Sequence, residues 1–264
     1  NPMATDAAAL AKRLEEEGVP TKAGRFDPEC LWVDSSDVSF TETSSFAAGE
    51  FIVQDEASSL AARFAGVLPG QRALDACAAP GGKTAVLMWM AGPAGKVVAA
   101  DSAPGRLGRL KNNCARISAP VRILAMDAER PAFGEVFDNV LIDAPCSGLG
   151  VIRRHPDARW RLREKDVERH GREQRDLLTG VAKAVQPGGW LTYSVCTNEP
   201  EETDKVAEVM DRAGFVRGPG RDFLPHAARR FVGADGALRI LPEMGDGLDG
   251  FFAVRWRREV ASID

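Results

Sequence analysis

Short apolar runs alternate with helix-like segments over most of the chain, from about residue 50 onward. Four of these runs, 72–75, 97–101, 121–127 and 137–143, end at an aspartate. Apolar residues at helical spacing fill the stretches 83–91 and 104–116 between the first three runs. This order predicts an α/β fold with a parallel sheet and right-handed crossovers. The aspartates are then expected along one edge of the sheet, where such folds bind ligands.

The flanking regions continue the pattern with fewer elements. A helix is expected over 7–17 and a short strand over 31–33, before a polar stretch that reaches Gly49. After the fourth aspartate-ended run the sequence predicts a helix, a strand, a helix and two strands, at 166–185, 190–194, 201–212, 215–216 and 251–254. Asn1 is not an initiator residue, which predicts that the chain is a piece of a longer protein.

Composition is ordinary for a globular protein, with 264 residues, 44% hydrophobic and 27% charged. This length suits one large α/β domain, alone or with a small appendage. No apolar stretch is long enough to span a bilayer, so no membrane partner is expected. The five cysteines form no C-x-x-C pair, which indicates neither a zinc site nor a disulfide framework. We expect no metal, and a reducing cytoplasm as the location.

The net charge of −4 argues against a uniformly basic surface for nucleic acid. Residues 153–175 are the exception, with nine basic and five acidic side chains. A second basic run is Arg255-Trp256-Arg257-Arg258. Each run is either a solvated surface or part of a nucleic-acid path.

A turn of small residues follows the first strand and opens the next helix. Its sequence is Cys77-Ala78-Ala79-Pro80-Gly81-Gly82-Lys83-Thr84. It is not a phosphate-binding P-loop, because Cys77 stands where that motif needs its first glycine. Asp101 ends the second strand 19 residues after Gly82, where a carboxylate accepts hydrogen bonds from ribose hydroxyls.

A ligand with a free ribose, an adenine and no pyrophosphate fits this pattern, which indicates S-adenosylmethionine. Asp127 is expected near the adenine amino group, although an aspartate after a strand also commonly forms a turn. The expected cofactor residues are those of the turn, with the aspartates and one arginine: Cys77, Ala78, Ala79, Pro80, Gly81, Gly82, Lys83, Asp101, Arg106, Asp127 and Asp143.

Two cysteines each follow a short apolar run that predicts a buried strand. They are Cys146 in Asp143-Ala144-Pro145-Cys146 and Cys196 in Tyr193-Ser194-Val195-Cys196. Parallel strand ends meet at one edge, so both thiols are expected at one site, as a nucleophile and its assistant. The alternative is that both are small buried hydrophobic residues.

Together these segments resemble the Nop/Sun family of RNA cytosine-5 methyltransferases, in particular its bacterial 16S ribosomal-RNA branch. The matching segments follow the family's order: 49–58, 77–84, Asp101, Asp127, 143–148, 150–157, 193–197 and 249–252. The chain departs from the family at Val195, where a threonine is usual before the nucleophilic cysteine.

The resemblance implies a class I methyltransferase fold, a Rossmann-like and mostly parallel seven-stranded sheet with helices on both faces. The catalytic domain is expected over 49–264. Residues 1–48 are expected to be the end of an N-terminal RNA-binding or linker region. In the bacterial branch a helical domain resembling an antitermination factor often precedes this region.

The resemblance also assigns roles at the site. Cys196 is expected to attack carbon 6 of cytosine, and Cys146 to assist release. Asp143 is expected to bind the edge of the base, with Lys83 as its electrostatic partner. The expected partner is RNA, in particular ribosomal RNA, bound by a monomer through Arg153, Arg154 and His155, with Trp160 as a candidate for base stacking.

Two other functions remain open at this point. A DNA cytosine-5 methyltransferase would use the cysteine of the Pro145-Cys146 pair as its nucleophile, but Cys196 and the segment after Arg153 favour RNA. A catalytically silent RNA-binding or ribosome-assembly module would keep the fold but would need neither thiol, nor Lys83, nor the four aspartates.

Overall fold

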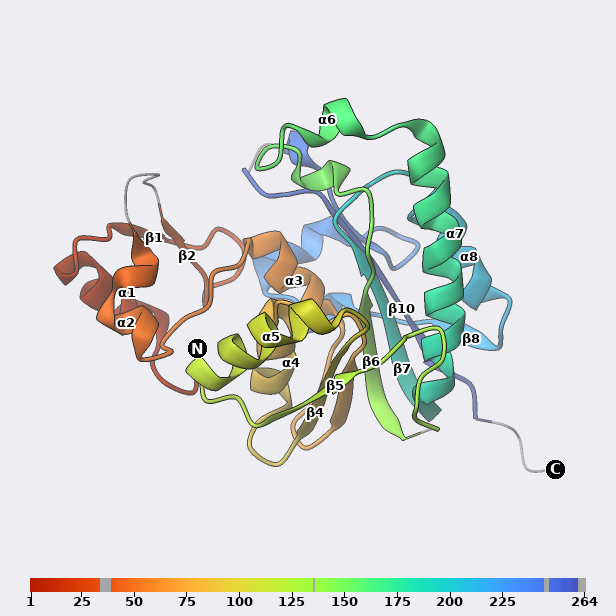
Figure 1. The fold of residues 1–264 in the computed structure, drawn as a ribbon, viewed down its shortest axis with the longest axis horizontal. Helices are drawn as coiled ribbons and strands as arrows, with labels where there is room; N and C mark the ends of the chain where they lie inside the picture. The colour runs from red at the N-terminus through yellow and green to blue at the C-terminus, as the bar shows by residue number, and fades with distance from the viewer. Residues whose placement is uncertain (34–38, 135, 245–246, 261–264) are drawn as a thin grey trace.

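A computed structural model describes residues 1–33, 39–134, 136–244 and 247–260 of the chain. Its centre is a mixed sheet whose strands run in the order β5-β4-β3-β6-β7-β10-β8, with the short β9 paired to β10 (Figure 1). The first five are parallel, and β10 is antiparallel to each of its three neighbours. The strands are β3 (Arg72–Asp75), β4 (Lys96–Asp101), β5 (Val121–Ala125), β6 (Phe137–Asp143), β7 (Val185–Val195), β8 (Phe215–Arg217), β9 (Leu238–Ile240) and β10 (Phe251–Arg258).

Helices cover both faces of the sheet (Figure 1). One face carries α3, α4 and α5, and the other carries α7 and α8. The helices of this region are α3 (Glu56–Phe64), α4 (Gly82–Ala91), α5 (Pro104–Arg116), α6 (Ala158–Arg161), α7 (Glu164–Val181) and α8 (Asp204–Asp211). The short α6 lies beyond the sheet edge, between the loop after β6 and α7 (Figure 1).

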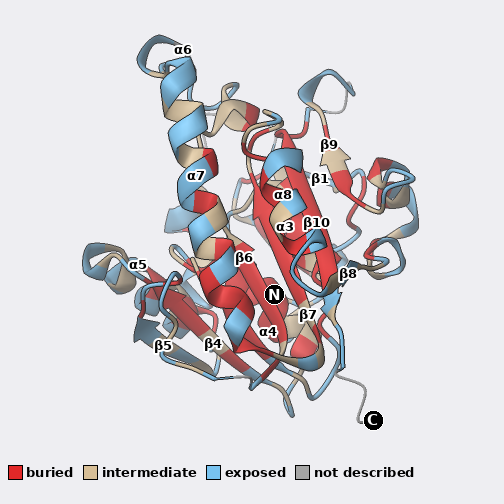
Figure 2. Ribbon diagram, turned by 90° about the vertical axis from the view of Figure 1, so that its right-hand side faces the viewer, coloured by how far each residue is buried: buried red, intermediate tan, exposed pale blue. Residues whose placement is uncertain are grey.

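The two faces of the sheet have separate hydrophobic cores, because successive side chains of a strand point to opposite sides. In β10, Phe252 and Val254 pack with Leu178 of α7. Their neighbours Phe251 and Ala253 pack with α3 on the other face. The central strands are consequently buried on both sides (Figure 2).

A small N-terminal unit lies beside this layered body (Figure 1). It comprises α1 (Ala7–Glu16), β1 (Thr21–Ala23), β2 (Leu31–Val33) and α2 (Ser44–Ala47), with β1 and β2 paired antiparallel. Glu56, the first residue of α3, joins the unit to the body. Its buried carboxylate accepts hydrogen bonds from the Phe26 and Asp27 amides and the Trp32 indole, each at 2.7 Å.

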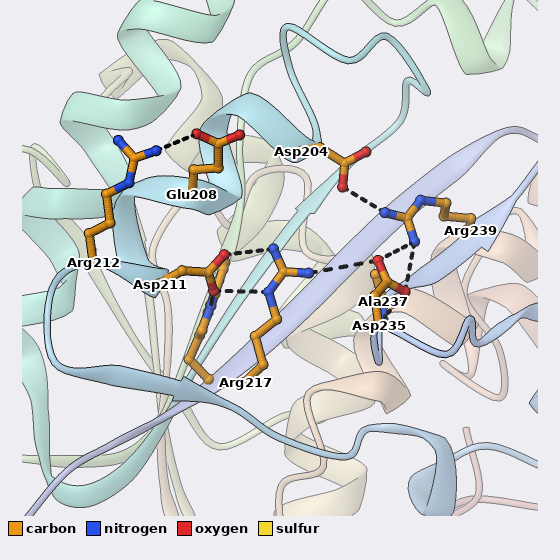
Figure 3. Close-up of polar contacts among 9 residues, drawn as sticks. Asp204, Glu208, Asp211, Arg212, Arg217, Asp235, Ala237 and Arg239 are labelled. Atoms are coloured by element: carbon orange, nitrogen blue, oxygen red, sulfur yellow. Dashed lines mark hydrogen bonds and ion pairs between the residues drawn. The ribbon is translucent and has the colours of Figure 1, made fainter.

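Ion pairs hold the far edge of the sheet together (Figure 3). Arg217 of β8 pairs with Asp211 of α8 at 2.7 Å, and Arg239 of β9 pairs with Asp204 of the same helix at 2.6 Å. Asp235 bridges the two arginines. These contacts fix α8 against β8 and β9.

The predicted architecture is confirmed, with β9 added to the expected seven strands. The helix expected to reach residue 185 ends at Val181, because Val185 already pairs with Phe137 as the start of β7. Helices α3 and α6 and strand β9 were not predicted. The basic run at 255–258 is not a surface patch: Arg255 and Trp256 are buried in β10.

Arg255 lies between two aromatic rings rather than in solvent. Its guanidinium carbon is 3.9 Å from the ring centroid of Trp190 and 4.8 Å from that of Phe223. Burial lowers the pKa of Arg255 to about 9. Within the described part of the chain, no helix combines the length and the apolar character needed to cross a membrane.

The Glu56 carboxylate predicts a large effect on stability. Replacing Glu56→Ala leaves buried amides and an indole N–H without an acceptor, and we expect a loss of about 3 kcal/mol in the free energy of unfolding. Glu56→Gln keeps an acceptor at the same place and should cost much less. Urea denaturation measures both; equal stability of the alanine variant and the wild type would contradict the assigned role.

Candidate active site

The predicted site residues meet at the carboxyl edge of the parallel strands. A cavity of about 650 Å³ opens there. Side chains from several helices, strands and their adjoining loops line it, among them Asp75, Lys83, Asp143, Arg154, Cys196 and Phe251. Phe251 reaches the same edge because β10 runs antiparallel and begins where the parallel strands end.

Lys83 and Asp143 form the central ion pair of the cavity. Lys83, in the first turn of α4, is only 8% exposed. Its Nζ lies 2.8 Å from Asp143 Oδ2 and donates to Ser58 Oγ at 2.8 Å. It also lies 4.8 Å from the ring centroid of Phe251. A buried ammonium needs such partners, and here they come from α3, β6 and β10.

Asp143 is held on its other side as well. Ser194 Oγ, near the end of β7, donates to Asp143 Oδ1 at 2.7 Å. The two strands pair directly, with Asp143 opposite Ser194 in the register. Both carboxylate oxygens therefore have fixed partners, so Asp143 has one orientation in the cavity.

The two predicted thiols are in contact. Cys146 Sγ and Cys196 Sγ lie 3.2 Å apart, and both side chains are half-buried. Cys196 is among the residues that line the cavity, whereas Cys146, in the loop after β6, meets the site through its contact with Cys196. This distance suits a hydrogen bond from one thiol to the sulfur of the other.

The surrounding charges distinguish the two thiols. A hydrogen bond from Cys146, aided by the Lys83 charge, lowers the pKa of Cys196 against the opposing effects of burial and Asp143. The same hydrogen bond, together with burial and the nearby charges of Glu202 and Asp143, raises the pKa of Cys146 well above its usual range. These opposite directions favour ionisation of Cys196 over ionisation of Cys146.

The turn before α4 depends on Gly81 for its shape. Gly81 has φ +109°, which L side chains rarely adopt, and an added Cβ would come within 2.9 Å of Leu110 Cδ1. All the predicted turn residues from Cys77 to Lys83 line the cavity. Burial raises the pKa of Cys77, so its thiol stays protonated.

The predicted ribose acceptor Asp101 is buried beneath this turn. Its carboxylate accepts hydrogen bonds from the Ala79 amide at 3.2 Å and the Ala103 amide at 2.9 Å. Arg106 covers it, with Nη2 at 2.9 Å from Asp101 Oδ1. Asp127 is exposed after β5 and accepts from the Glu129 amide at 3.0 Å, which is the turn-forming arrangement.

Asp75 provides a test of whether a cationic cofactor fits. It ends β3, lines the cavity and is fully buried. Thr84 Oγ1 donates to one carboxylate oxygen at 2.7 Å, while Oδ1 has no hydrogen-bond partner among the described residues. Burial raises the pKa of Asp75 to about 7. An acceptor of this kind beside a glycine turn fits a ligand that carries positive charge.

The predicted RNA-binding arginines stand at the rim of the cavity and are already paired. Arg154 Nη2 lies 2.6 Å from Asp249 Oδ2, and Arg153 Nη2 lies 3.3 Å from Asp249 Oδ1. Both side chains remain about half exposed. His155 also lines the cavity and is exposed. Asp249 therefore offsets part of the positive charge that the sequence assigned to this segment.

Sequence reasoning missed several side chains that hold the site. No sequence pattern singles out Ser58. The helix α3 that carries it could have been predicted from the capping Asp55 and from the helical spacing of the apolar residues that follow, which are Ala57, Leu60, Ala61 and Phe64. Ser194 could have been found from the two-residue period that places it on the same side of β7 as Cys196. Nothing in the sequence pattern links Asp249 to Arg154, 95 residues earlier.

A family model described as 16S rRNA methyltransferase RsmB/F matches residues 67–257. The chain belongs to this family. Ribosomal RNA small subunit methyltransferase B of Vibrio cholerae serotype O1 is 36% identical to the chain over 223 residues, 80% of the chain and 51% of that protein. The probable ribosomal RNA small subunit methyltransferase B of Bacillus subtilis strain 168 is 34% identical, over 98% of the chain and 59% of that protein.

A solved structure agrees with the fold. The crystal structure of PH0851 superposes with a TM-score of 0.88 at 33% identity, over 96% of the chain and 57% of that protein. The chain thus spans somewhat more than half the length of these relatives. Membership of the RsmB/F methyltransferase family supports S-adenosylmethionine as the cofactor, in agreement with the sequence pattern.

The thiol pair predicts how Cys196 reacts with alkylating reagents. We expect iodoacetamide to modify wild-type Cys196 at a lower pH than an ordinary thiol, because the thiolate accepts a hydrogen bond from Cys146. In Cys146→Ala this bond is lost and the pKa of Cys196 should rise. Rates against pH, with the modified residue identified by mass spectrometry, measure the shift; identical profiles would contradict the assigned hydrogen bond.

Asp75 predicts that cofactor affinity depends on pH. With its pKa raised to about 7, the carboxyl is mostly protonated at lower pH and becomes an anion as the pH rises. A cationic cofactor should therefore bind about eightfold more tightly at about pH 7.5 than at about pH 6, if only the ionised form binds it. Calorimetric titration of the wild type should show this rise, and Asp75→Asn should show little of it. A flat wild-type profile would remove Asp75 from the cofactor site.

Proposed function

We propose that this chain transfers the methyl group of S-adenosylmethionine to carbon 5 of a cytosine in RNA, with ribosomal RNA as the substrate. The observation that carries the proposal is the contact between Cys196 and Cys146 beside the Lys83–Asp143 pair. A thiol ready to ionise, a proton-donating thiol and an oriented carboxylate are the groups that such chemistry needs. A silent binding module would have no use for this arrangement.

The first step requires a nucleophile because carbon 5 of cytosine is itself a poor one. The Cys196 thiolate forms a bond to carbon 6, and the electron pair of the 5,6 double bond makes carbon 5 nucleophilic. The cofactor supplies the methyl group that carbon 5 then takes up. Cys196 suits this role better than Cys146, because Cys196 lines the cavity and has the lowered pKa.

Asp143 and Lys83 bind and orient the base during this step. The Asp143 carboxylate faces the cavity, and we assign it to the cytosine edge, where it accepts a hydrogen bond from the 4-amino group and stabilises positive charge at ring nitrogen 3. Lys83 and Ser194 fix its direction. Because both partners are anchored in regular elements, the carboxylate needs little reorganisation when the base enters.

Release requires a second reaction at the same atoms. The proton on carbon 5 leaves, the 5,6 double bond forms again, and the bond between carbon 6 and Cys196 breaks with its electron pair on sulfur. Cys146, 3.2 Å from that sulfur, assists this step. The opposite assignment, with Cys146 as nucleophile, is the mechanism of the DNA-type alternative.

We place the RNA across the rim formed by the loop after β6 and by α6. The target base must leave its stack to reach Cys196, which favours a single-stranded or loop region of RNA. His155 lies at the cavity and Trp160 of α6 is 84% exposed, so it is available to stack on a neighbouring base. Arg153 and Arg154 remain candidates for phosphate contacts. Residues 1–48 remain a proposed part of the RNA-binding region.

Covalent trapping separates the two thiols. With unmodified small-subunit ribosomal RNA and labelled cofactor, Cys196→Ala should abolish methylation and any covalent RNA adduct. Cys146→Ala should accumulate an adduct that survives denaturation, because attack and methyl transfer proceed while release stalls. A denaturing gel run on reactions at about pH 8.5, where Cys196 ionises to a useful extent in the wild type and in Cys146→Ala, measures this.

The same gel tests the alternatives. An adduct that persists in Cys196→Ala and disappears in Cys146→Ala would assign the DNA-type mechanism. DNA of the same sequence serves as the control substrate, and its methylation in preference to RNA would overturn the substrate class. Absence of any methyl transfer by the wild type would favour the binding module.

A further inference from the structure

Three buried polar side chains lie behind the loop that carries Cys146. Gln174 of α7, Tyr193 of β7 and Glu202, which follows β7, are each 0% exposed. Gln174 Nε2 donates to Glu202 Oε2 at 2.8 Å. The Tyr193 hydroxyl lies 3.0 Å from Gln174 Oε1 and 2.6 Å from the Glu202 carbonyl oxygen. The three form one connected network that no step assigned above uses.

This network holds the residues on both sides of Cys146. Gln174 Nε2 donates to the Pro145 carbonyl at 2.9 Å. The Ser147 amide donates to Glu202 Oε2, also at 2.9 Å. The backbone before and after the thiol is therefore fixed from a single side, by groups that belong to α7 and to the segment after β7. Few loop positions are held by two buried side chains at once.

Stability alone is a poor reason for such a network. Burying a carboxylate costs free energy that its hydrogen bonds only partly offset, and Glu202 Oε1 has no partner among the described residues. The charge also acts on the site, because Glu202 is one of the groups that raise the pKa of Cys146. Both its hydrogen bonds and its charge thus favour a protonated Cys146 in one position.

We propose that Gln174 and Glu202 are positioning residues that hold the Cys146 thiol against the Cys196 sulfur, so that the covalent RNA intermediate is released rather than retained. The inference rests on the proposed function, and it assigns Gln174 and Glu202 to the last step of that reaction, the release of RNA from Cys196. In that step the carbon 5 proton passes to water, its electron pair restores the 5,6 double bond, and the electron pair of the broken carbon–sulfur bond returns to Cys196. The Cys146 thiol donates a hydrogen bond to the sulfur as it becomes a thiolate.

Two RNA substrates separate release from attack. RNA with ordinary cytosine reports the whole reaction. RNA with 5-fluorocytosine cannot lose a proton from carbon 5 after methyl transfer, so it remains attached and reports attack and methyl transfer alone. The wild type should trap the fluorinated RNA and turn over the ordinary RNA.

The first variant is Gln174→Met, which keeps the length of the side chain but loses its three hydrogen bonds, to Pro145, Glu202 and Tyr193. We expect the fraction of enzyme attached to ordinary RNA to rise about fivefold or more, with a matching fall in released product. Trapping of the fluorinated RNA should fall much less. Glu202→Leu should behave in the same way, and Glu202→Gln, which keeps an acceptor for Ser147, should restore most of the release.

A matched control comes from the same sheet. Asn139 of β6 is also a buried amide, 1% exposed, and donates to Gln71 Oε1 at 2.6 Å near the opposite sheet edge. Asn139→Ala should lower stability without changing the ratio of attached to released RNA.

The outcomes distinguish this inference from the proposed function. If Gln174→Met lowers release and fluorinated-RNA trapping in equal proportion, as Asn139→Ala would through instability, the network is only structural and the inference is wrong. If Glu202→Gln fails to restore release relative to Glu202→Leu, the assigned hydrogen bond to Ser147 is wrong. If the wild type itself traps no fluorinated RNA, it is the proposed function that fails.

Discussion

The arrangement of the site depends on the buried ammonium of Lys83. An ammonium that is 8% exposed must be surrounded by acceptors, and its partners come from three other elements. Ser58 belongs to α3, Asp143 ends β6, and the ring of Phe251 begins β10. The sheet order places β6 between β3 and β7, with β10 beyond, so these partners reach one point only in this topology. The same positive charge then favours the Cys196 thiolate.

The difference in pKa between the two thiols comes first from the hydrogen bond between them, and the charges around the pair add to it. Lys83 contributes positive charge on the side of Cys196, while Glu202 contributes negative charge on the side of Cys146. A thiol pair in a uniform environment would share its proton without preference. Here the hydrogen bond and the surrounding charges favour ionisation of Cys196, the thiol that lines the cavity, over ionisation of Cys146. The sequence could show that two cysteines meet, but not which of them ionises.

Whether a feature could be predicted from the sequence depends on how far apart along the chain its interacting residues lie. The strands at 72–75 and 137–143 were predicted to the residue, because each is a local apolar run that ends at a polar position. The meeting of the two thiols was predicted because parallel strand ends share an edge, whereas Lys83 was assigned to the site by the family resemblance. The helix α3 was missed because its small residues weaken the helical period. The burial of Arg255 was missed because Trp190 and Phe223, which cover it, are distant in the sequence.

The ion pair of Arg154 at the rim of the cavity is connected through the backbone to the residues around Lys83. Arg154 binds Asp249, which is followed by Gly250 and then by Phe251, whose ring lies against Lys83. Gly250 also donates to the Gly150 carbonyl at 2.8 Å, and a side chain at Gly150 would clash with this backbone. A phosphate that competes with Asp249 for Arg154 would act on the same short segment that carries Phe251. The Arg154–Asp249 ion pair at the rim is thus only two residues along the chain from the aromatic ring that borders the Lys83 ammonium.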